Sequence, residues 1–111
     1  MEMRRVVVTG LGSLTPIGNN VEQYWQGLIN GVSGAAPITH FDASQAKTQF
    51  ACEVKDFDAS QFFDRKEARK YDKFSQYGIV AATQAMENCG IDLEKLDEDR
   101  AGVIWASGIG G

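Results

Sequence analysis

Two stretches of consecutive apolar residues, near opposite ends of the chain, constrain its fold more than any other feature. Residues 4–9, Arg-Arg-Val-Val-Val-Thr, carry three β-branched residues in a row, and residues 101–106, Ala-Gly-Val-Ile-Trp-Ala, are mostly apolar. Neither stretch alternates between apolar and polar positions, which is typical of strands buried on both faces of a parallel sheet. We therefore expect two central strands in a sheet that is sandwiched by helices.

The first predicted helix follows the strand at 4–9. Residues 21–30 place their apolar side chains on one face at helical spacing. Asn20 followed by Gln23 resembles a capping box with asparagine in place of serine or threonine. Gly31 is placed to end the helix in a left-handed conformation.

The sequence in the middle of the chain predicts a long irregular segment followed by further helices. Residues 33–58 are irregular with one short alternating piece at 50–54, and residues 59–71 indicate short helical turns. Residues 72–89 predict the longest helix, with Gly90 as its stop. Apolar residues lie nearly all round this helix, so we expect it to be buried on several sides. The order strand, helix, excursion, helix, strand predicts an α/β fold without an internal domain boundary.

The number of predicted strands is small for an independent sheet. Two clear strands and one short one leave at least one apolar strand at an edge, where it is an aggregation hazard. The long helix likewise has little protein in which to be buried. We therefore expect residues 1–111 to be one segment of a larger body, formed by a longer chain or by tightly bound partners.

Composition excludes several functional classes. The chain is 43% hydrophobic and 23% charged, with a net charge of −4, so no general attraction to nucleic acid or to acidic membranes is expected. No apolar run is long enough to span a bilayer or to form a signal peptide, and we expect a cytoplasmic protein.

The two cysteines and the single histidine offer little chemistry. Cys52 and Cys89 form no Cys-x-x-Cys motif, and with His40 alone the chain cannot assemble a Cys/His zinc site, so no metal is expected. We interpret both cysteines as small buried apolar residues. His40 is interpreted as a structural hydrogen-bond donor, since no nucleophile is paired with it.

The glycine-rich segment after the first strand departs from the dinucleotide-binding fingerprint. Residues 10–18 read Gly-Leu-Gly-Ser-Leu-Thr-Pro-Ile-Gly, and Thr15 stands where that fingerprint requires its third glycine. We interpret Gly10, Gly12 and Gly18 as allowing tight turns and close packing.

Two further features have competing interpretations. Lys66, Arg69 and Lys70 fall near one another on a helical surface and suit an acidic or phosphate-bearing partner, but they also fit a solvated face partly neutralised by nearby acidic residues. The loop 107–111, Ser-Gly-Ile-Gly-Gly, allows a ligand to approach the backbone and frees Ile109 to move. The alternative is an ordinary turn at the end of a strand.

Six motifs follow one another along the chain. They are Val6-Val-Val-Thr-Gly-Leu-Gly-Ser-Leu-Thr-Pro-Ile-Gly-Asn19, His40-Phe-Asp42, Val54-Lys-Asp-Phe57, Arg65-Lys-Glu-Ala-Arg-Lys-Tyr-Asp72, Gln76-Tyr-Gly-Ile79 and Ser107-Gly-Ile-Gly-Gly111. In this order they closely resemble the 3-oxoacyl-acyl carrier protein synthases, the condensing enzymes of bacterial fatty-acid synthesis. Ile109 and the proline-containing turn at 15–18 are more similar to synthase II than to synthase I.

The resemblance implies a fold and a reaction. The fold is the N-terminal part of a thiolase-like layered αβαβα arrangement, incomplete in this chain. The reaction is a decarboxylative Claisen condensation of malonyl-acyl carrier protein with an acyl thioester held on a cysteine, assisted by two histidines and without a cofactor. None of these catalytic residues matches a position here, so the resemblance places them beyond Gly111 and implies that residues 1–111 alone are inactive.

The resemblance also implies roles for five residues. Lys66, Arg69 and Lys70 match positions that dock the acidic carrier protein, which favours the partner interpretation of the basic cluster. Ile109, with Gly108 beside it, matches the residue that gates the acyl-chain pocket. The implied partners are acyl carrier protein, acyl and malonyl thioesters and a second copy in a homodimer.

Two alternatives to a condensing enzyme remain. One is a non-catalytic partner subunit of the same fold, of the chain-length-factor type. The other is an isolated carrier-protein-binding fragment. The presence or replacement of the nucleophilic cysteine distinguishes the enzyme from the partner subunit.

Overall fold

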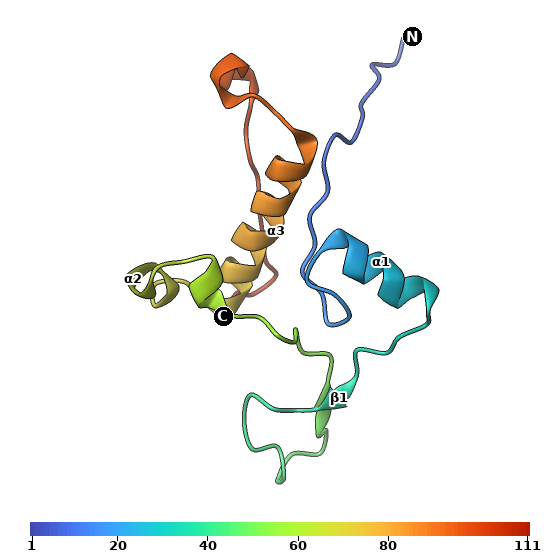
Figure 1. The fold of residues 1–111 in the computed structure, drawn as a ribbon, viewed down its shortest axis with the longest axis vertical. Helices are drawn as coiled ribbons and strands as arrows, with labels where there is room; N and C mark the ends of the chain where they lie inside the picture. Colours follow the sequence, from blue (N-terminus) through green and yellow to red (C-terminus); the bar gives the residue numbers. More distant parts are fainter.

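A computed structural model describes all of residues 1–111. The central helix α3 lies between α1 on one side and the short helix α2 on the other, with a small hairpin of β1 and β2 beyond them (Figure 1). The elements in chain order are α1 (Val21–Ile29), β1 (Ala36–Pro37), β2 (Phe50–Ala51), α2 (Arg65–Ala68) and α3 (Lys73–Cys89), with single 3₁₀ turns at Ala59–Gln61, Leu93–Lys95 and Glu98–Arg100.

Helix α1 forms where the apolar spacing predicts it, and its N-terminus is capped by side chains. The Asn20 carboxamide oxygen accepts a hydrogen bond from the Gln23 backbone N–H at 2.9 Å. The Gln23 side chain reaches back to the Asn19 N–H at 2.9 Å, one residue before the position expected for a capping box. Gly31 has φ +63°, which confirms the left-handed ending of this helix.

Helix α3 is also confirmed, and Gly90 ends it with φ +62°. The expectation that it is buried on several sides is wrong for this structure. Only Gln76 and Val80 of its residues are buried, because the segments around α3 cover a single side of it.

The glycine-rich segment is attached to α3 by a short series of hydrogen bonds. The Leu11 N–H donates to Asn88 Oδ1 at 3.1 Å, and the Ser13 N–H donates to Gln84 Oε1 at 3.0 Å. Residues four apart on a helix rise by about 6 Å, close to the roughly 6.6 Å between alternate residues of an extended chain. Side chains four residues apart on α3 can therefore accept hydrogen bonds from alternate backbone N–H groups of this segment, as the carbonyls of a neighbouring strand would.

Glycines make this close attachment sterically feasible. A Cβ atom on Gly10 would lie 2.6 Å from the Cβ of Cys89, and one on Gly12 would lie 2.8 Å from the Ala85 backbone nitrogen. A Cβ on Gly18 would lie 2.8 Å from the Cβ of Gln23. The interpretation of these glycines as close-packing residues is confirmed.

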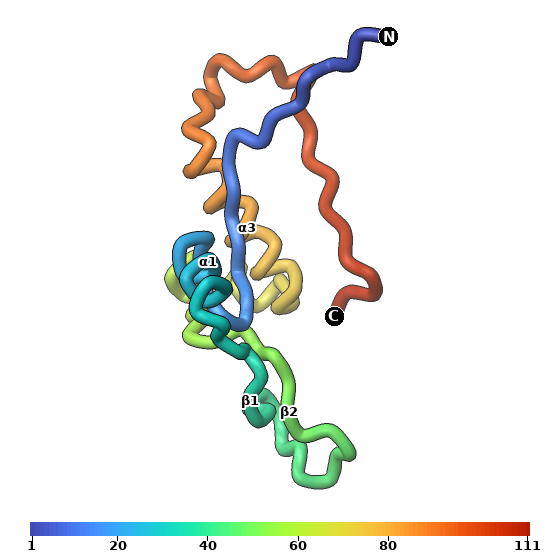
Figure 2. Tube along the Cα trace, turned by 90° about the vertical axis from the view of Figure 1, so that its right-hand side faces the viewer, coloured from blue at the N-terminus to red at the C-terminus, as the bar shows by residue number.

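The two predicted central strands, 4–9 and 101–106, do not form a sheet. Figure 2 shows them as separate extended stretches, and Val6 and Ile104 are 92% and 99% exposed. The sheet of this structure is the antiparallel pair β1–β2, in which Ala36 pairs with Ala51 and Pro37 with Phe50. A β-branched run becomes a strand only when another segment completes its hydrogen-bond ladder, and no strand of this chain pairs with either stretch.

The open shape agrees with this lack of pairing. The radius of gyration is 17.5 Å, whereas a compact domain of this length has about 13 Å. Four residues are buried, namely Gly27, Ala43, Gln76 and Val80. Only two of the four belong to α3, so the chain has no closed hydrophobic interior.

The interpretation of both cysteines as buried is wrong. Cys52 is exposed because it follows β2 in a hairpin whose outer side has no neighbour. Cys89 is partly exposed at the end of α3, where its thiol donates to the Met86 carbonyl at 3.1 Å. Both thiols are free.

Candidate functional site

Helix α2 carries the basic cluster, and an aspartate determines where it begins. One carboxylate oxygen of Asp64 accepts hydrogen bonds from the backbone N–H groups of Lys66 and Glu67, at 2.8 and 2.7 Å. This N-cap satisfies donors that an isolated short helix would leave free. It also directs the Asp64 charge to the backbone rather than to a basic side chain.

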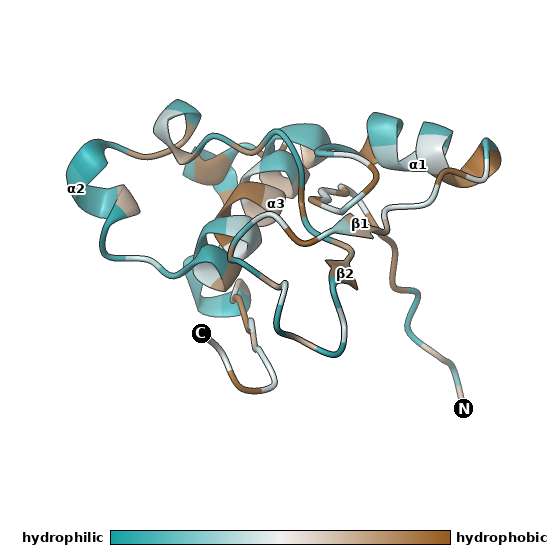
Figure 3. Ribbon diagram, turned by 90° about the horizontal axis from the view of Figure 1, so that it is seen from below, coloured by the Kyte–Doolittle hydropathy of each residue, from teal (hydrophilic) through white to brown (hydrophobic).

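The basic cluster is exposed on α2 and the turn that follows it. Lys66 lies within α2, Arg69 caps its C-terminus and Lys70 lies in the turn. Lys95 forms an ion pair with Asp92 and the His40 ring lies near Glu53, whereas none of the three basic residues pairs with an acidic side chain. Figure 3 shows α2 as a hydrophilic element on the side of the molecule away from α1. The expected neutralisation by nearby acidic residues does not take the form of ion pairs.

An apolar groove of about 400 Å³ lies between α3 and the extended residues 103–107. The Trp105 ring covers Gly78, and a Cβ on that glycine would lie 2.9 Å from the indole nitrogen. Glycine at position 78 therefore allows the indole to rest directly on the helix. The groove is lined by Tyr71, Phe74, Ser75, Gly78, Ile79, Ala82, Val103, Trp105, Ala106 and Ser107.

The loop with the predicted gate lies just beyond this groove. Ile109 is fully exposed and Gly108 has open space around it. A Cβ on Gly110 would lie 3.3 Å from the Phe74 ring, so the loop turns back toward the first turn of α3. The structure thus places Ile109 next to the apolar groove but not among its lining residues. The assignment of Ile109 and Gly108 to acyl binding stays a prediction.

A second cavity, of about 380 Å³, has Thr39, His40 and Glu53 in its lining and was not predicted. The Glu53 carboxylate accepts hydrogen bonds from the Thr39 N–H at 3.1 Å, the Thr39 hydroxyl at 2.8 Å and the His40 N–H at 3.3 Å. The His40 ring nitrogen Nδ1 lies 3.8 Å from the same carboxylate. The hydrogen bonds from Thr39 hold the pKa of Glu53 below its ordinary value of 4.5.

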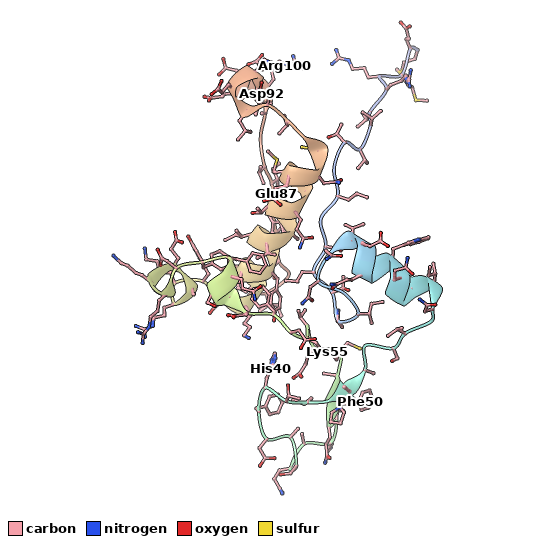
Figure 4. All side chains as sticks on the ribbon, in the orientation of Figure 1. His40, Phe50, Lys55, Glu87, Asp92 and Arg100 are labelled. Atoms are coloured by element: carbon pink, nitrogen blue, oxygen red, sulfur yellow. The ribbon has the colours of Figure 1, made fainter.

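Two neighbours of Glu53 connect the hairpin to the rest of the chain. Lys55 donates to the carbonyls of Gly34 at 2.8 Å and Pro16 at 3.2 Å, and Figure 4 shows it on the segment after β2, with His40 on the hairpin loop. Tyr77 of α3 packs edge-on against Phe57, with ring centroids 5.1 Å apart. Burial raises the pKa of the Tyr77 phenol, and the negative charge of Glu53 adds to this effect.

The hydrogen bonds to Glu53 predict an acid-sensitive hairpin. Since the pKa of Glu53 is lower in the folded than in the unfolded chain, its ionised form stabilises the hairpin above about pH 4.5, and this contribution is lost as pH falls through the lowered pKa. We expect the Thr39 and His40 amide NMR resonances to move with this carboxyl group as pH falls below about 4.5. The Glu53→Gln variant should lack the transition, whereas Glu94→Gln, at an exposed glutamate, should keep it.

No group of three or more histidine, cysteine, aspartate or glutamate side chains could hold a metal ion. None of the helices is both long and apolar enough to cross a bilayer.

The chain belongs to the β-ketoacyl synthase family. The family model described as "Beta-ketoacyl synthase, N-terminal domain" matches residues 3–111. The predicted thiolase-like α/β class is supported in turn by similarity to solved ketosynthase structures.

Curated relatives and solved structures give finer comparisons. Over 111 residues the chain is 50% identical to the 3-oxoacyl-[acyl-carrier-protein] synthase 2 of Synechocystis sp. and to that of Vibrio harveyi, covering 100% of this chain and 27% of each relative. It superposes on the ishigamide ketosynthase/chain length factor with a TM-score of 0.75 and 39% identity, covering 84% of this chain and 23% of that one. A type II polyketide synthase acyl-carrier protein in complex with its ketosynthase gives a TM-score of 0.60 at 30% identity. This match covers 86% of this chain and 25% of that chain.

These matches cover the whole chain but only part of each relative. The chain spans about a quarter of the length of the synthases that it resembles. The resemblance first stated from the six motifs is confirmed at the level of the family.

Proposed function

We propose that the protein containing this chain is a fatty-acid chain-elongating acyltransferase of the synthase 2 type. It would condense malonyl-acyl carrier protein with an enzyme-bound acyl thioester, with loss of carbon dioxide. The single observation that carries this proposal is the 50% identity to synthases of that name across all 111 residues. This match covers the whole chain, so it includes the basic helix and the loop at 107–111.

We propose that residues 1–111 form the N-terminal segment of the ketosynthase domain and are inactive alone. His40, Cys52 and Cys89 are not arranged for nucleophilic catalysis, since the His40 imidazole faces Glu53 and Cys89 donates to a carbonyl at a helix end. Nucleophile activation needs a base held beside the nucleophile. The catalytic cysteine and histidines would then lie after Gly111.

The test is an elongation assay with purified full-length protein, malonyl-acyl carrier protein and, as primer, an acyl group attached to acyl carrier protein as a thioester. Release of carbon dioxide together with a 3-oxoacyl product two carbons longer than the primer supports the proposal. Absence of both, with a relative of known activity as positive control, contradicts it.

A second candidate is a non-catalytic partner subunit of the chain-length-factor type. It is favoured by one observation, the TM-score of 0.75 to the ishigamide ketosynthase/chain length factor. The residue at the nucleophile position of the full-length protein decides between them, since a cysteine there supports the enzyme. An isolated carrier-protein-binding fragment would instead bind carrier protein as residues 1–111 alone.

We propose acyl carrier protein as the partner of Lys66, Arg69 and Lys70. The exposure of these side chains and their lack of ion pairs support a surface that is free to receive an acidic partner. A solved relative that holds an acyl-carrier protein with its ketosynthase adds to this support.

We also propose, from the resemblance to the synthases, that the full-length protein is a cytoplasmic homodimer.

Enlarging Ile109 is expected to shorten the acyl chains that the full-length protein accepts. The Ile109→Phe variant places a larger, aromatic side chain at the proposed entrance of the acyl pocket. Rates with long acyl primers should therefore fall, while rates with short primers change little. Competition between primers of different length measures this preference, with Ile109→Val as the control. An unchanged preference in Ile109→Phe would refute the gating assignment.

A further inference from the structure

The buried residue Gln76 makes two contacts that were not predicted. Its side chain is on the covered side of α3, and the residue is 7% exposed. The carboxamide Nε2 donates to the Ala68 carbonyl at 2.9 Å and to the Tyr71 carbonyl at 3.1 Å. A buried glutamine is uncommon unless its polar atoms are paired, and here both side-chain N–H groups have a partner.

These two carbonyls lie on either side of two residues of the basic cluster. Ala68 is the last residue of α2 and Tyr71 lies just before α3, so Arg69 and Lys70 are the residues between the two carbonyls that Gln76 binds. The last carbonyls of a helix have no partner within it. Gln76 supplies one for α2, which is only four residues long and has no other connection of this kind to α3.

Asp64 and Gln76 therefore hold the basic segment from opposite ends. The Asp64 carboxylate fixes the first turn of α2, and the Gln76 carboxamide fixes its end and the following turn to α3. Side chains on a backbone held in this way lose less freedom when they bind a partner, and the resulting gain in affinity is that of preorganisation.

We propose that Gln76 is a positioning residue for carrier-protein docking, acting through the backbone of Arg69 and Lys70. This inference rests on the proposed docking role of the basic cluster. It assigns no contact between Gln76 and any substrate. Loss of the two hydrogen bonds should weaken recognition of carrier-bound substrates while the chemical step is unaffected.

The test uses Gln76→Met and Gln76→Glu in the full-length protein. Both keep the length of the side chain, and neither can donate two hydrogen bonds at neutral pH. We expect KM for the carrier-bound acyl substrate to rise roughly fivefold, a change of about 1 kcal/mol, with kcat unchanged. Turnover of a small acyl thioester without carrier protein should also be unchanged.

Gln84 provides a matched control on the same helix. It lies eight residues later on the same side of α3, and it bonds the Ser13 N–H and the Asn19 carbonyl rather than the α2 segment. The Gln84→Met variant should leave KM for acyl-carrier protein unchanged. An equal rise in KM for both variants would overturn the inference.

Charge reversal separates this inference from the proposed docking itself. If Lys66→Glu raises KM for acyl-carrier protein but Gln76→Met does not, the positioning role is wrong and the docking surface stands. If neither raises it, both are wrong. A fall in small-thioester turnover as large as the effect on carrier-bound substrate would indicate a general structural role and also overturn the inference.

Discussion

The Gly12→Ala substitution is expected to destabilise the attachment of the N-terminal segment to α3. The new Cβ would lie 2.8 Å from the Ala85 nitrogen and 2.9 Å from the Ala81 carbonyl carbon, so backbone must move. Overpacking of this kind costs about 1–3 kcal/mol. The decrease in the free energy of unfolding can be measured by denaturant titration of the full-length protein, together with faster hydrogen exchange at the Leu11 and Ser13 amides.

Gly102→Ala is the control for this prediction. A Cβ on Gly102 meets no atom within 4 Å, and neither glycine has a positive φ, so the two substitutions differ in their surroundings. Gly102→Ala should be neutral or slightly stabilising, because alanine restricts the unfolded chain. Equal effects of the two substitutions would show that the segment does not pack on α3 as described.

The helices could be predicted because their signals are local. The apolar spacing of residues 21–30 and the cap at Asn20 lie within one stretch of chain, as do the left-handed stops at Gly31 and Gly90. One detail differed, since Gln23 bonds the Asn19 N–H instead of the Asn20 N–H. That choice depends on the backbone geometry of the preceding turn rather than on residue type.

The strands could not be predicted in the same way because their state depends on neighbours. Residues 4–9 and 101–106 have the composition of central strands, yet they remain extended and exposed. The Leu11 and Ser13 amides are bonded instead by Asn88 and Gln84 of α3. Backbone donors near the predicted strand thus use the helix, which was expected only to cover the sheet.

The candidate site was partly predictable for a similar reason. The exposure of Lys66, Arg69 and Lys70 follows from residue type, whereas the anchoring of their backbone by Gln76 depends on how α2 folds back against α3. A glutamine four residues before Val80 on the covered stripe of a helix was a weak signal for such a contact. Glu53 gave no signal, because Thr39 becomes its neighbour only through the pairing of β1 and β2.

Net charge and local charge have opposite signs within residues 1–111, which matters for the proposed partner. These residues carry −4 in total, so their own long-range field would repel an acidic carrier protein. Ionic screening acts over about 8 Å at physiological salt, so the local potential near α2 dominates at contact. Recognition of an acidic partner should therefore depend strongly on Lys66 and Arg69.

Reversing both charges, Lys66→Glu with Arg69→Glu, is expected to raise KM for acyl-carrier protein roughly tenfold or more at low salt. Each exposed charge contact contributes up to about 1 kcal/mol, and reversal replaces attraction with repulsion at both positions. The effect should appear mainly in the association rate and should shrink as salt is added. Steady-state kinetics with carrier-bound and small thioester substrates, at two ionic strengths, measure it.

The Lys47→Glu variant makes the same kind of charge change on the loop between β1 and β2, at an exposed lysine outside the basic cluster. Because its local potential does not reach α2, it should leave KM for acyl-carrier protein within about twofold of the unmodified protein. If the double reversal has no larger effect than Lys47→Glu, the basic cluster is a solvated face and carrier protein docks elsewhere. If its effect is large but insensitive to salt, the substitutions act through the structure of α2, where Asp64 and Gln76 hold the backbone, rather than through charge.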